Sequence, residues 1–268
     1  MPRRLTHALL ALSSVGFIVF AAGGTAGASR GLGGLLSHST TKNAQQSGNW
    51  SGYVVNPAGG NVTGVASTFV VPKATLILPG LTSTWAGIGG DPSADLIQAG
   101  VSESPFPSNP ILGDQYFAWY ELLPASPVQL TGCTGDANCT VVPGDHVSVQ
   151  ITQTATNVWT ISVADGARWT WSMAGIKYGS SHSSAEWILE APTLLVAPVI
   201  PAGVGSAHFG PTSTFTVGGG SPQTIASGNP QAIDMSLLGL GLFNLATPSA
   251  LSADGQSFNV CTYAQTCS

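Results

Sequence analysis

Two acidic residues stand in one otherwise apolar segment of the sequence. Residues 184–190 read SAEWILE, and they hold Glu186 and Glu190, two of only twelve acidic residues in a chain of 268. A charged side chain inside a buried strand costs several kcal/mol when it is unpaired. Glu186 therefore either points to solvent from the outer face of a sheet, which the alternation of a strand allows, or has a chemical role. Composition alone leaves both interpretations open.

The motifs of other hydrolase classes are missing from the sequence. There is no H-E-x-x-H motif, and the five histidines are too dispersed to predict a metal cluster. The single G-x-S-x-G string, at residues 27–31, follows no predicted strand, so it does not indicate a nucleophilic serine. The two Asp-Thr/Ser-Gly loops of an aspartic protease are also missing. We therefore expect neither a metal nor a cofactor.

Seven short strings resemble those of the glutamic peptidase (eqolisin) family. Each string alone is weak, but all seven occur in the family's order, and together they cover essentially the whole predicted domain. They are NWSGY (49–53), WAGIGG (85–90), LIQAGV (96–101), AWYE (118–121), PGDHV (143–147), SAEWI (184–188) and SADGQSF (252–258).

The resemblance implies a fold, an activity and a set of site residues. Members of the family are secreted, acid-active endopeptidases built from two large antiparallel sheets, and they act on protein or peptide substrates. Carried over by motif, the catalytic Gln is Gln98 and the catalytic Glu is Glu186. Trp85 matches the tryptophan of the family's cleft. Tyr120 is a further candidate for substrate binding, whereas we interpret its neighbour Glu121 as structural.

These residue types suit peptide hydrolysis in acid. The reaction needs a base for water, a donor for the oxyanion and an acid for the leaving amine. Glu186 can act as base and then as acid, and the Gln98 amide can donate without titrating. We expect activity below neutrality and negligible activity at pH 7 and above. Glu190 has the parity of Glu186 but lies about 13 Å further along the strand, so Glu190→Gln serves as a control.

The sequence departs from the family pattern near the first catalytic motif. Fungal members carry an Asp that supports the catalytic Glu at the position of Gly89, and we expect Asp91 or Asp95 to replace it. They also place a cysteine soon afterwards, where this chain has residues 92–94, PSA. Any disulfides here must differ.

The elements that position these residues are strands. Gly and Pro occupy 34 + 18 = 52 positions, and no segment carries a sustained helical pattern of apolar residues. Polar and apolar residues alternate in 146–155, 158–165 and 167–175, which predicts a three-stranded meander. We predict an all-β domain at residues 48–268, a two-sheet antiparallel β-sandwich of the concanavalin-like jelly-roll kind. Other predicted strands are 50–55, 65–71, 82–88, 95–102, 115–122, 127–130, 184–191, 212–217, 231–237 and 256–263, with long loops at 192–211 and 218–230.

The N-terminus is typical of a secretory signal peptide. Arg3 and Arg4 precede an apolar stretch at 8–22 and an A-G-A cleavage motif at 26–28. We predict a signal peptide at 1–28, with an uncleaved membrane anchor as the alternative, and a flexible leader or short pro-segment at 29–47. Cleavage removes two of seven basic residues, and five basic against twelve acidic residues give a net charge of −7. We expect a secreted monomer that binds no nucleic acid and, once cleaved, no membrane.

Four cysteines in an exported chain favour disulfides. Cys133 and Cys139 lie six residues apart, as do Cys261 and Cys267. Of the three possible connectivities we favour these two local pairs. A zinc site is not expected, because the spacing is not C-x-x-C and no histidine is nearby.

Two other functions stay open. A carbohydrate-binding β-sandwich without enzymatic activity is one, since fold does not fix function and Trp85, Trp119, Trp169 and Trp171 could form a stacking platform. The other is an inert structural protein. Glu186→Gln separates them, because a lectin keeps its ligand whereas a peptidase loses turnover.

Overall fold

Nearly all regular structure is β-strand. The structure, a computed structural model, describes residues 44–75, 80–104, 116–166, 168–194, 197–198, 200–264 and 266–268. Within these ranges the only helix is the short 3₁₀ turn η1 (Ile225–Gly228). The strands are β1 (Gln45–Ser47), β2 (Trp50–Val55), β3 (Val62–Val70), β4 (Thr82–Gly89), β5 (Leu96–Glu103), β6 (Phe117–Leu122), β7 (Val128–Gln129), β8 (His146–Ala155), β9 (Val158–Asp165), β10 (Trp169–Lys177), β11 (Ala185–Glu190), β12 (Thr193–Leu194), β13 (Ala197–Pro198), β14 (Ser206–Phe209), β15 (Thr214–Val217), β16 (Gln223–Thr224), β17 (Gln231–Leu237), β18 (Leu242–Pro248) and β19 (Phe258–Thr262).

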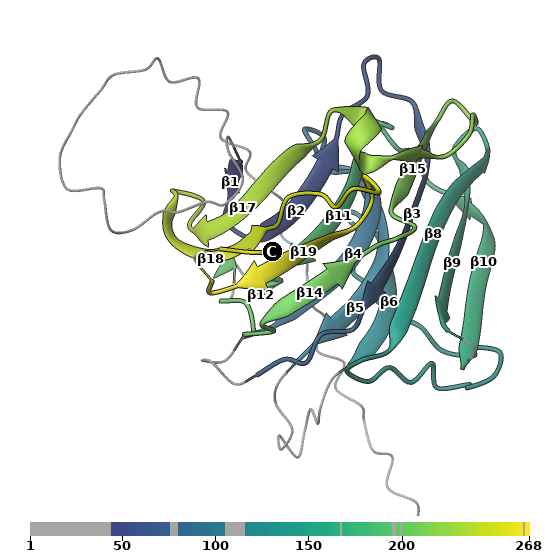
Figure 1. The fold of residues 1–268 in the computed structure, drawn as a ribbon. Helices are drawn as coiled ribbons and strands as arrows, with labels where there is room; N and C mark the ends of the chain where they lie inside the picture. Colours follow the sequence, from purple (N-terminus) through teal and green to yellow (C-terminus); the bar gives the residue numbers. More distant parts are fainter. Residues whose placement is uncertain are drawn as a thin grey trace, which may run out of the picture.

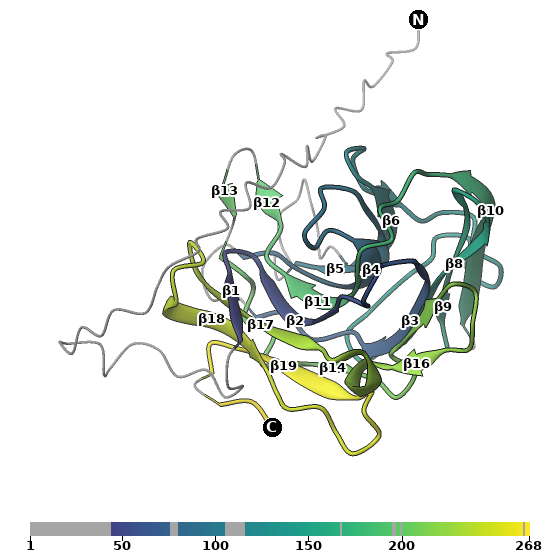
Figure 2. The ribbon, with the colours of Figure 1, turned by 90° about the horizontal axis from the view of Figure 1, so that it is seen from above.

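The strands form a two-layer antiparallel sandwich. One layer runs β7–β6–β5–β4–β11–β2–β17, and the other runs β19–β14–β3–β8–β9–β10. Strand β18 pairs with both β17 and β19, so hydrogen bonding continues from one layer into the other. In two perpendicular views β1, β17 and β18 lie at one end of the molecule and β8, β9 and β10 at the other (Figures 1 and 2). The predicted sandwich is confirmed.

The main hydrophobic core lies between the two layers. Ala86, Ile97 and Trp187 of the first layer belong to the same buried cluster as Val149 and Ile161 of the second. Alternate residues of the meander β8–β9–β10 supply its other wall, as the polar/apolar alternation predicts. Burial of large apolar side chains there contributes about 1.5–3 kcal/mol each.

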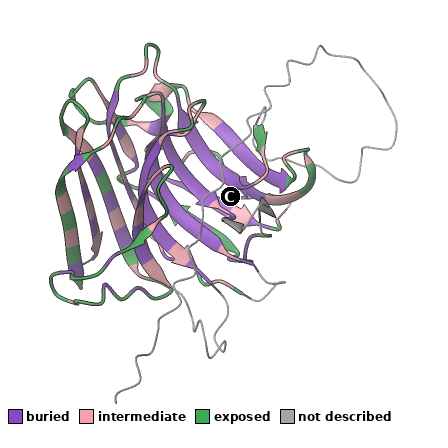
Figure 3. Cartoon of the chain, turned by 180° about the vertical axis from the view of Figure 1, so that it is seen from behind, coloured by how far each residue is buried: buried purple, intermediate pink, exposed green. Residues whose placement is uncertain are grey.

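The central strands of the first layer are buried on both faces. Every residue of β2 and β4 is buried, and so are all but one of β5 and of β11. Figure 3 shows this as continuous purple along the central strands, whereas β8, β9 and β10 are banded. The side chains facing away from the main core form a second buried cluster, which includes Trp50, Trp85 and Trp119. Glu186 is therefore not a solvent-facing residue.

Several local predictions hold and others do not. Cys133 is bonded to Cys139 and Cys261 to Cys267, as predicted. The predicted leader at 29–47 ends in β1, which pairs in parallel with β17, so the sheet begins before residue 48. Strands β12, β13 and β14 lie in the stretch 192–211 and β16 lies in 218–230, both expected to be loops, because alternation over two to four residues is too short to detect. Strand β18 is also missing from the predicted strands.

The N-terminal predictions largely fall outside the structure. The signal peptide at 1–28 and the leader as far as residue 43 lie outside the described residues. Within the described part, no helix is long and apolar enough to cross a membrane.

Candidate active site

Four residues form one row across four neighbouring strands. The strand register pairs Glu186 with Gly87, Gly87 with Gln98, and Gln98 with Glu121. Directly paired residues in antiparallel strands project from the same face. Glu186, Gln98 and Glu121 therefore share the face that turns away from the main core. Gln98 and Glu186 are 88 positions apart in the sequence, yet only strand β4 separates their two strands.

Gly87 lies between the two predicted catalytic residues and carries no side chain. Neighbouring strands lie about 4.8 Å apart, so the Cα atoms of Glu186 and Gln98 are separated by roughly 10 Å. A Cβ atom on Gly87 would stand 3.1 Å from Cβ of Gln98 and 3.0 Å from Cζ3 of Trp85. Neighbouring side chains pack against this glycine, so the row has no room for a larger residue at its centre.

The Gln98 side chain is held on one side only. Its Nε2 donates to Oε2 of Glu121 at 2.6 Å, and both residues are buried. Its Oε1 is buried and has no hydrogen-bond partner within the described part of the chain. The Nε2 end of the amide is fixed by Glu121 on β6, whereas Oε1 can still accept a hydrogen bond.

Glu186 is buried with an unusually basic carboxylate. Its side chain has no exposed surface, and neither carboxylate oxygen makes a hydrogen bond of normal geometry to a described residue. Burial raises the pKa of Glu186 well above its usual value; the Ser184 hydroxyl opposes this shift, and the negative charges of Asp91 and Asp95 add to it. This environment favours the neutral form of the carboxyl.

Trp85 lies next to this row and is anchored by a third acid. Its indole Nε1 donates to Oε2 of Glu190 at 2.8 Å, and Asn49 Nδ2 donates to Oε1 at 3.1 Å. Burial, followed by the charge of Glu121, raises the pKa of Glu190 to about 8, although its hydrogen bonds oppose the shift. Glu190 is therefore part of the same face, and it is not the inert control that its distance from Glu186 along the strand predicted.

The acid expected to replace the missing aspartate can be located. Asp91 accepts a hydrogen bond from Asn56 Nδ2 at 2.9 Å, whereas Asp95 lies against Gly89. Oδ2 of Asp95 would stand 2.9 Å from a Cβ on Gly89, and it accepts from the Ser181 backbone at 2.6 Å. Although burial opposes the shift, hydrogen bonds from Ser181 and Ser93 lower the pKa of Asp95. Asp95 thus fills the space of a side chain at position 89.

Tyr120 lies on the opposite face from Gln98. It pairs with Ala99, whose side chain belongs to the main core, and its ring stacks on Trp171 with centroids 5.5 Å apart. The prediction that Tyr120 lines the site with Gln98 therefore disagrees with the structure. Its neighbour Glu121, interpreted from the sequence as structural, takes that place. The signal was present in the AWYE string, but only the register with β5 selects between the two residues.

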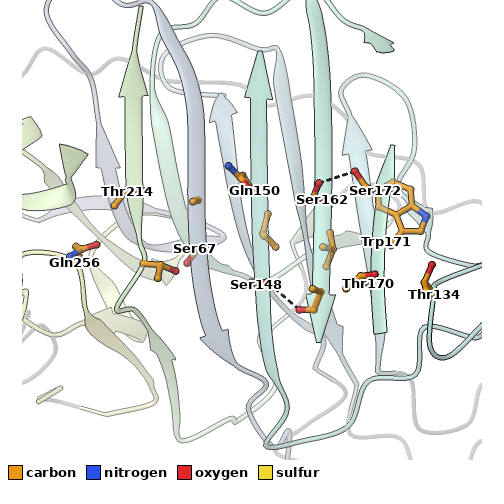
Figure 4. A pocket seen from close by; sticks show the side chains of 15 residues that line it. Ser67, Thr134, Ser148, Gln150, Ser162, Thr170, Trp171, Ser172, Thr214 and Gln256 are labelled. Carbon is orange, nitrogen blue, oxygen red and sulfur yellow. Dashed lines mark hydrogen bonds between the residues drawn. The ribbon is translucent and has the colours of Figure 1, made fainter. Parts of the chain in front are cut away.

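A separate groove lies on the outer face of the second layer. It measures about 760 Å³ and is lined by hydroxyl and amide side chains such as Ser148, Gln150, Ser162 and Thr170, with Trp171 beside them (Figure 4). None of its lining residues is ionisable, so the groove cannot supply a general base.

The described residues offer no metal site. Nowhere in those ranges do three His, Cys, Asp or Glu side chains gather closely enough to hold an ion. Of the carboxylates near Gln98, Glu121 accepts a hydrogen bond from the Gln98 amide and Glu190 accepts one from the Trp85 indole.

Comparisons with known proteins agree with this geometry. The chain resembles the crystal structure of scytalido-glutamic peptidase with a transition state analog inhibitor at 18% identity and a TM-score of 0.64, covering 81% of this chain and 100% of that one. It resembles SCP-B, a member of the eqolisin family in complex with the tripeptide Ala-Ile-His, at 18% identity, a TM-score of 0.59 and the same coverage. No match was found among curated proteins. The model of the peptidase A4 family matches residues 48–239, so the chain belongs to the peptidase A4 family and is a glutamic endopeptidase.

Proposed function

We propose that this protein is a secreted endopeptidase that hydrolyses peptide bonds in acid with Glu186 and Gln98 as its catalytic pair. The observation that carries the proposal is the row Glu186–Gly87–Gln98, in which a buried carboxyl and a buried amide lie on the same face of the sheet, one on each side of a glycine. The unpaired atoms are acceptors, Oε1 of Gln98 and the two carboxylate oxygens of Glu186, and a water molecule between them would satisfy them by donating its hydrogens.

The proposed reaction needs no other group. Ionised Glu186 takes a proton from water as the water oxygen attacks the scissile carbonyl carbon. An N–H of Gln98 donates to the oxyanion that forms. Glu186 then returns the proton to the departing amine as the C–N bond breaks, which leaves a free carboxyl group and a free amine. Trp85, whose indole donates a hydrogen bond to Glu190, forms the apolar wall beside this pair.

The charge pattern of the face supports activity in acid. Glu121, Glu186 and Glu190 share this face, and the two ion pairs within the described ranges join Arg168 to Asp145 and Asp165 elsewhere. As the pH rises toward the pKa of about 8 for Glu190, its carboxylate becomes charged and is repelled by that of Glu121. Glu186 must ionise to act as a base, and its raised pKa places the optimum in mild rather than strong acid.

The test is peptide release from a denatured protein between pH 2 and pH 8, read by mass spectrometry. The wild type should cleave in acid, and Glu186→Gln should reduce turnover by at least about 1000-fold while keeping the fold. Near-complete activity in Glu186→Gln, or an optimum at neutral pH, would reject the mechanism.

Carbohydrate binding remains the competing function, but of the four tryptophans of its predicted platform only Trp171, which lines the groove of Figure 4, is not buried. Trp85, Trp119 and Trp169 are each at most 4% exposed. This alternative would be favoured if the wild type showed no peptidase activity and the Glu186→Gln variant still bound a sugar ligand.

A further inference from the structure

We infer that Glu121 is a positioning residue for Gln98: it holds one N–H of the carboxamide and so fixes the orientation in which the second N–H is left for the oxyanion. The inference rests on the proposed function and adds a residue to it. Glu121 lies in register with Gln98 on the adjacent strand, and its Oε2 accepts from Nε2 at 2.6 Å. A distance this short is typical of a hydrogen bond to a charged acceptor.

A carboxamide without such a tether has two orientations of similar size and shape. They exchange the nitrogen and the oxygen, and only the nitrogen can donate to an oxyanion. An acceptor on β6 draws Nε2 toward itself, so one of its two hydrogens points to Glu121 and the other remains free. The reversed orientation would turn Oε1 toward Glu121 and place two acceptors together, which is unfavourable.

The surroundings of the pair limit other ways of fixing the amide. Gln98 is 3% exposed and Glu121 is 6% exposed, so bulk water competes little for either group. The third position of the row, Gly87, carries no side chain, and Oε1 of Gln98 has no partner among the described residues. The bond from Glu121 is the one side-chain hydrogen bond that the described structure provides to this amide.

The inference predicts a specific pattern in a double-mutant cycle. Glu121→Leu removes the acceptor and should lower kcat about 10- to 100-fold, with KM changed by less than about 3-fold. Glu121→Gln keeps an acceptor oxygen and should recover most of the loss. In a Gln98→Ala background, Glu121→Leu should add less than about 3-fold, because the group it positions is gone. An equal loss in both backgrounds would overturn the inference.

A spectroscopic measurement separates this inference from the proposed function. The side-chain amide signals of Gln98 in a ¹H–¹⁵N spectrum are identified by their disappearance in Gln98→Ala. They should shift in Glu121→Leu, and they should stay in place in the matched control Tyr120→Phe, which alters the opposite face of the same strand. A wild type without peptidase activity would reject the proposed function, whereas unshifted amide signals in Glu121→Leu would reject the tether.

Discussion

At the scale of single residues, the buried acids Glu186 and Glu190 differ in their hydrogen-bond partners. Glu190 is hydrogen bonded by Trp85 and Asn49, whereas Glu186 has no comparable donors among the described residues. Both nevertheless have raised pKa values, because burial outweighs the hydrogen bonds. Each carboxyl thus favours its neutral form, and charge is removed from the face in acid.

Glu190 offers a clean test of this account. With a pKa of about 8, it is neutral at pH 5, so Glu190→Gln should change the melting temperature there by no more than about 3 °C. At pH 8 the same substitution should make the protein more stable than the wild type, because glutamine cannot ionise. Thermal unfolding followed by circular dichroism measures both values. A variant that is equally destabilised at both pH values would contradict the neutral state of Glu190.

At the scale of elements, strand β4 sets the spacing of the site. It separates β11 from β5, and its residue in the catalytic row is Gly87. Next to it, Trp85 lies on the same face and packs edge-on against Trp50, with ring centroids 5.0 Å apart. The strand therefore supplies both the glycine between the two residues and the apolar wall beside them.

Gly87→Ala should damage activity more than folding. The new Cβ would stand 3.1 Å from Cβ of Gln98 and 2.9 Å from Cδ1 of Leu96, so these side chains must shift. A displacement of this size in a catalytic group lowers kcat by at least about 10-fold, and overpacking costs about 1–3 kcal/mol of stability. Kinetics and urea unfolding of the same preparation check the two effects. An unchanged kcat would show that activity does not depend on the absence of a side chain at position 87.

At the scale of the whole molecule, the buried acids make stability depend on pH. Besides Glu186 and Glu190, Glu103 is fully buried on the core side of β5, and burial raises its pKa well above 4.5, although Thr84 opposes the shift. A raised pKa in the folded state means that the folded protein binds the proton more tightly than the unfolded chain does. Stability from these groups is complete below about pH 4.5 and is lost as the pH rises.

The protein should therefore be more stable in mild acid than at neutral pH. The melting temperature should fall by at least about 5 °C between pH 4.5 and pH 7.5, since every tenfold difference in proton affinity between the folded and unfolded states corresponds to about 1.4 kcal/mol. Below pH 3.8 the trend should reverse, because hydrogen bonds lower the pKa of Asp136 and Asp254 in the folded state. Calorimetry across this range measures the profile. A maximum at or above pH 7 would contradict it.

The sequence by itself determined most of the longer strands, the disulfides and the identity of the candidate pair. Alternation predicted the meander β8–β9–β10 because each of its strands has one face in the core and one in solvent. Alternation could not describe β4 or β11, since both of their faces are buried. The resemblance in motifs supplied Gln98 and Glu186 instead.

Only the tertiary structure decided which residues stand around that pair. Within β6, Tyr120 and Glu121 are neighbours in sequence, yet their side chains point to opposite faces. The register against β5 decides which of them meets Gln98, and a shift of one residue would exchange them. Likewise, the pairing of β11 with β4 opposes Glu186 to a glycine and brings Glu190 to the indole of Trp85. Register is set by contacts between strands that are far apart in the chain, so it cannot be predicted from the sequence of one strand alone.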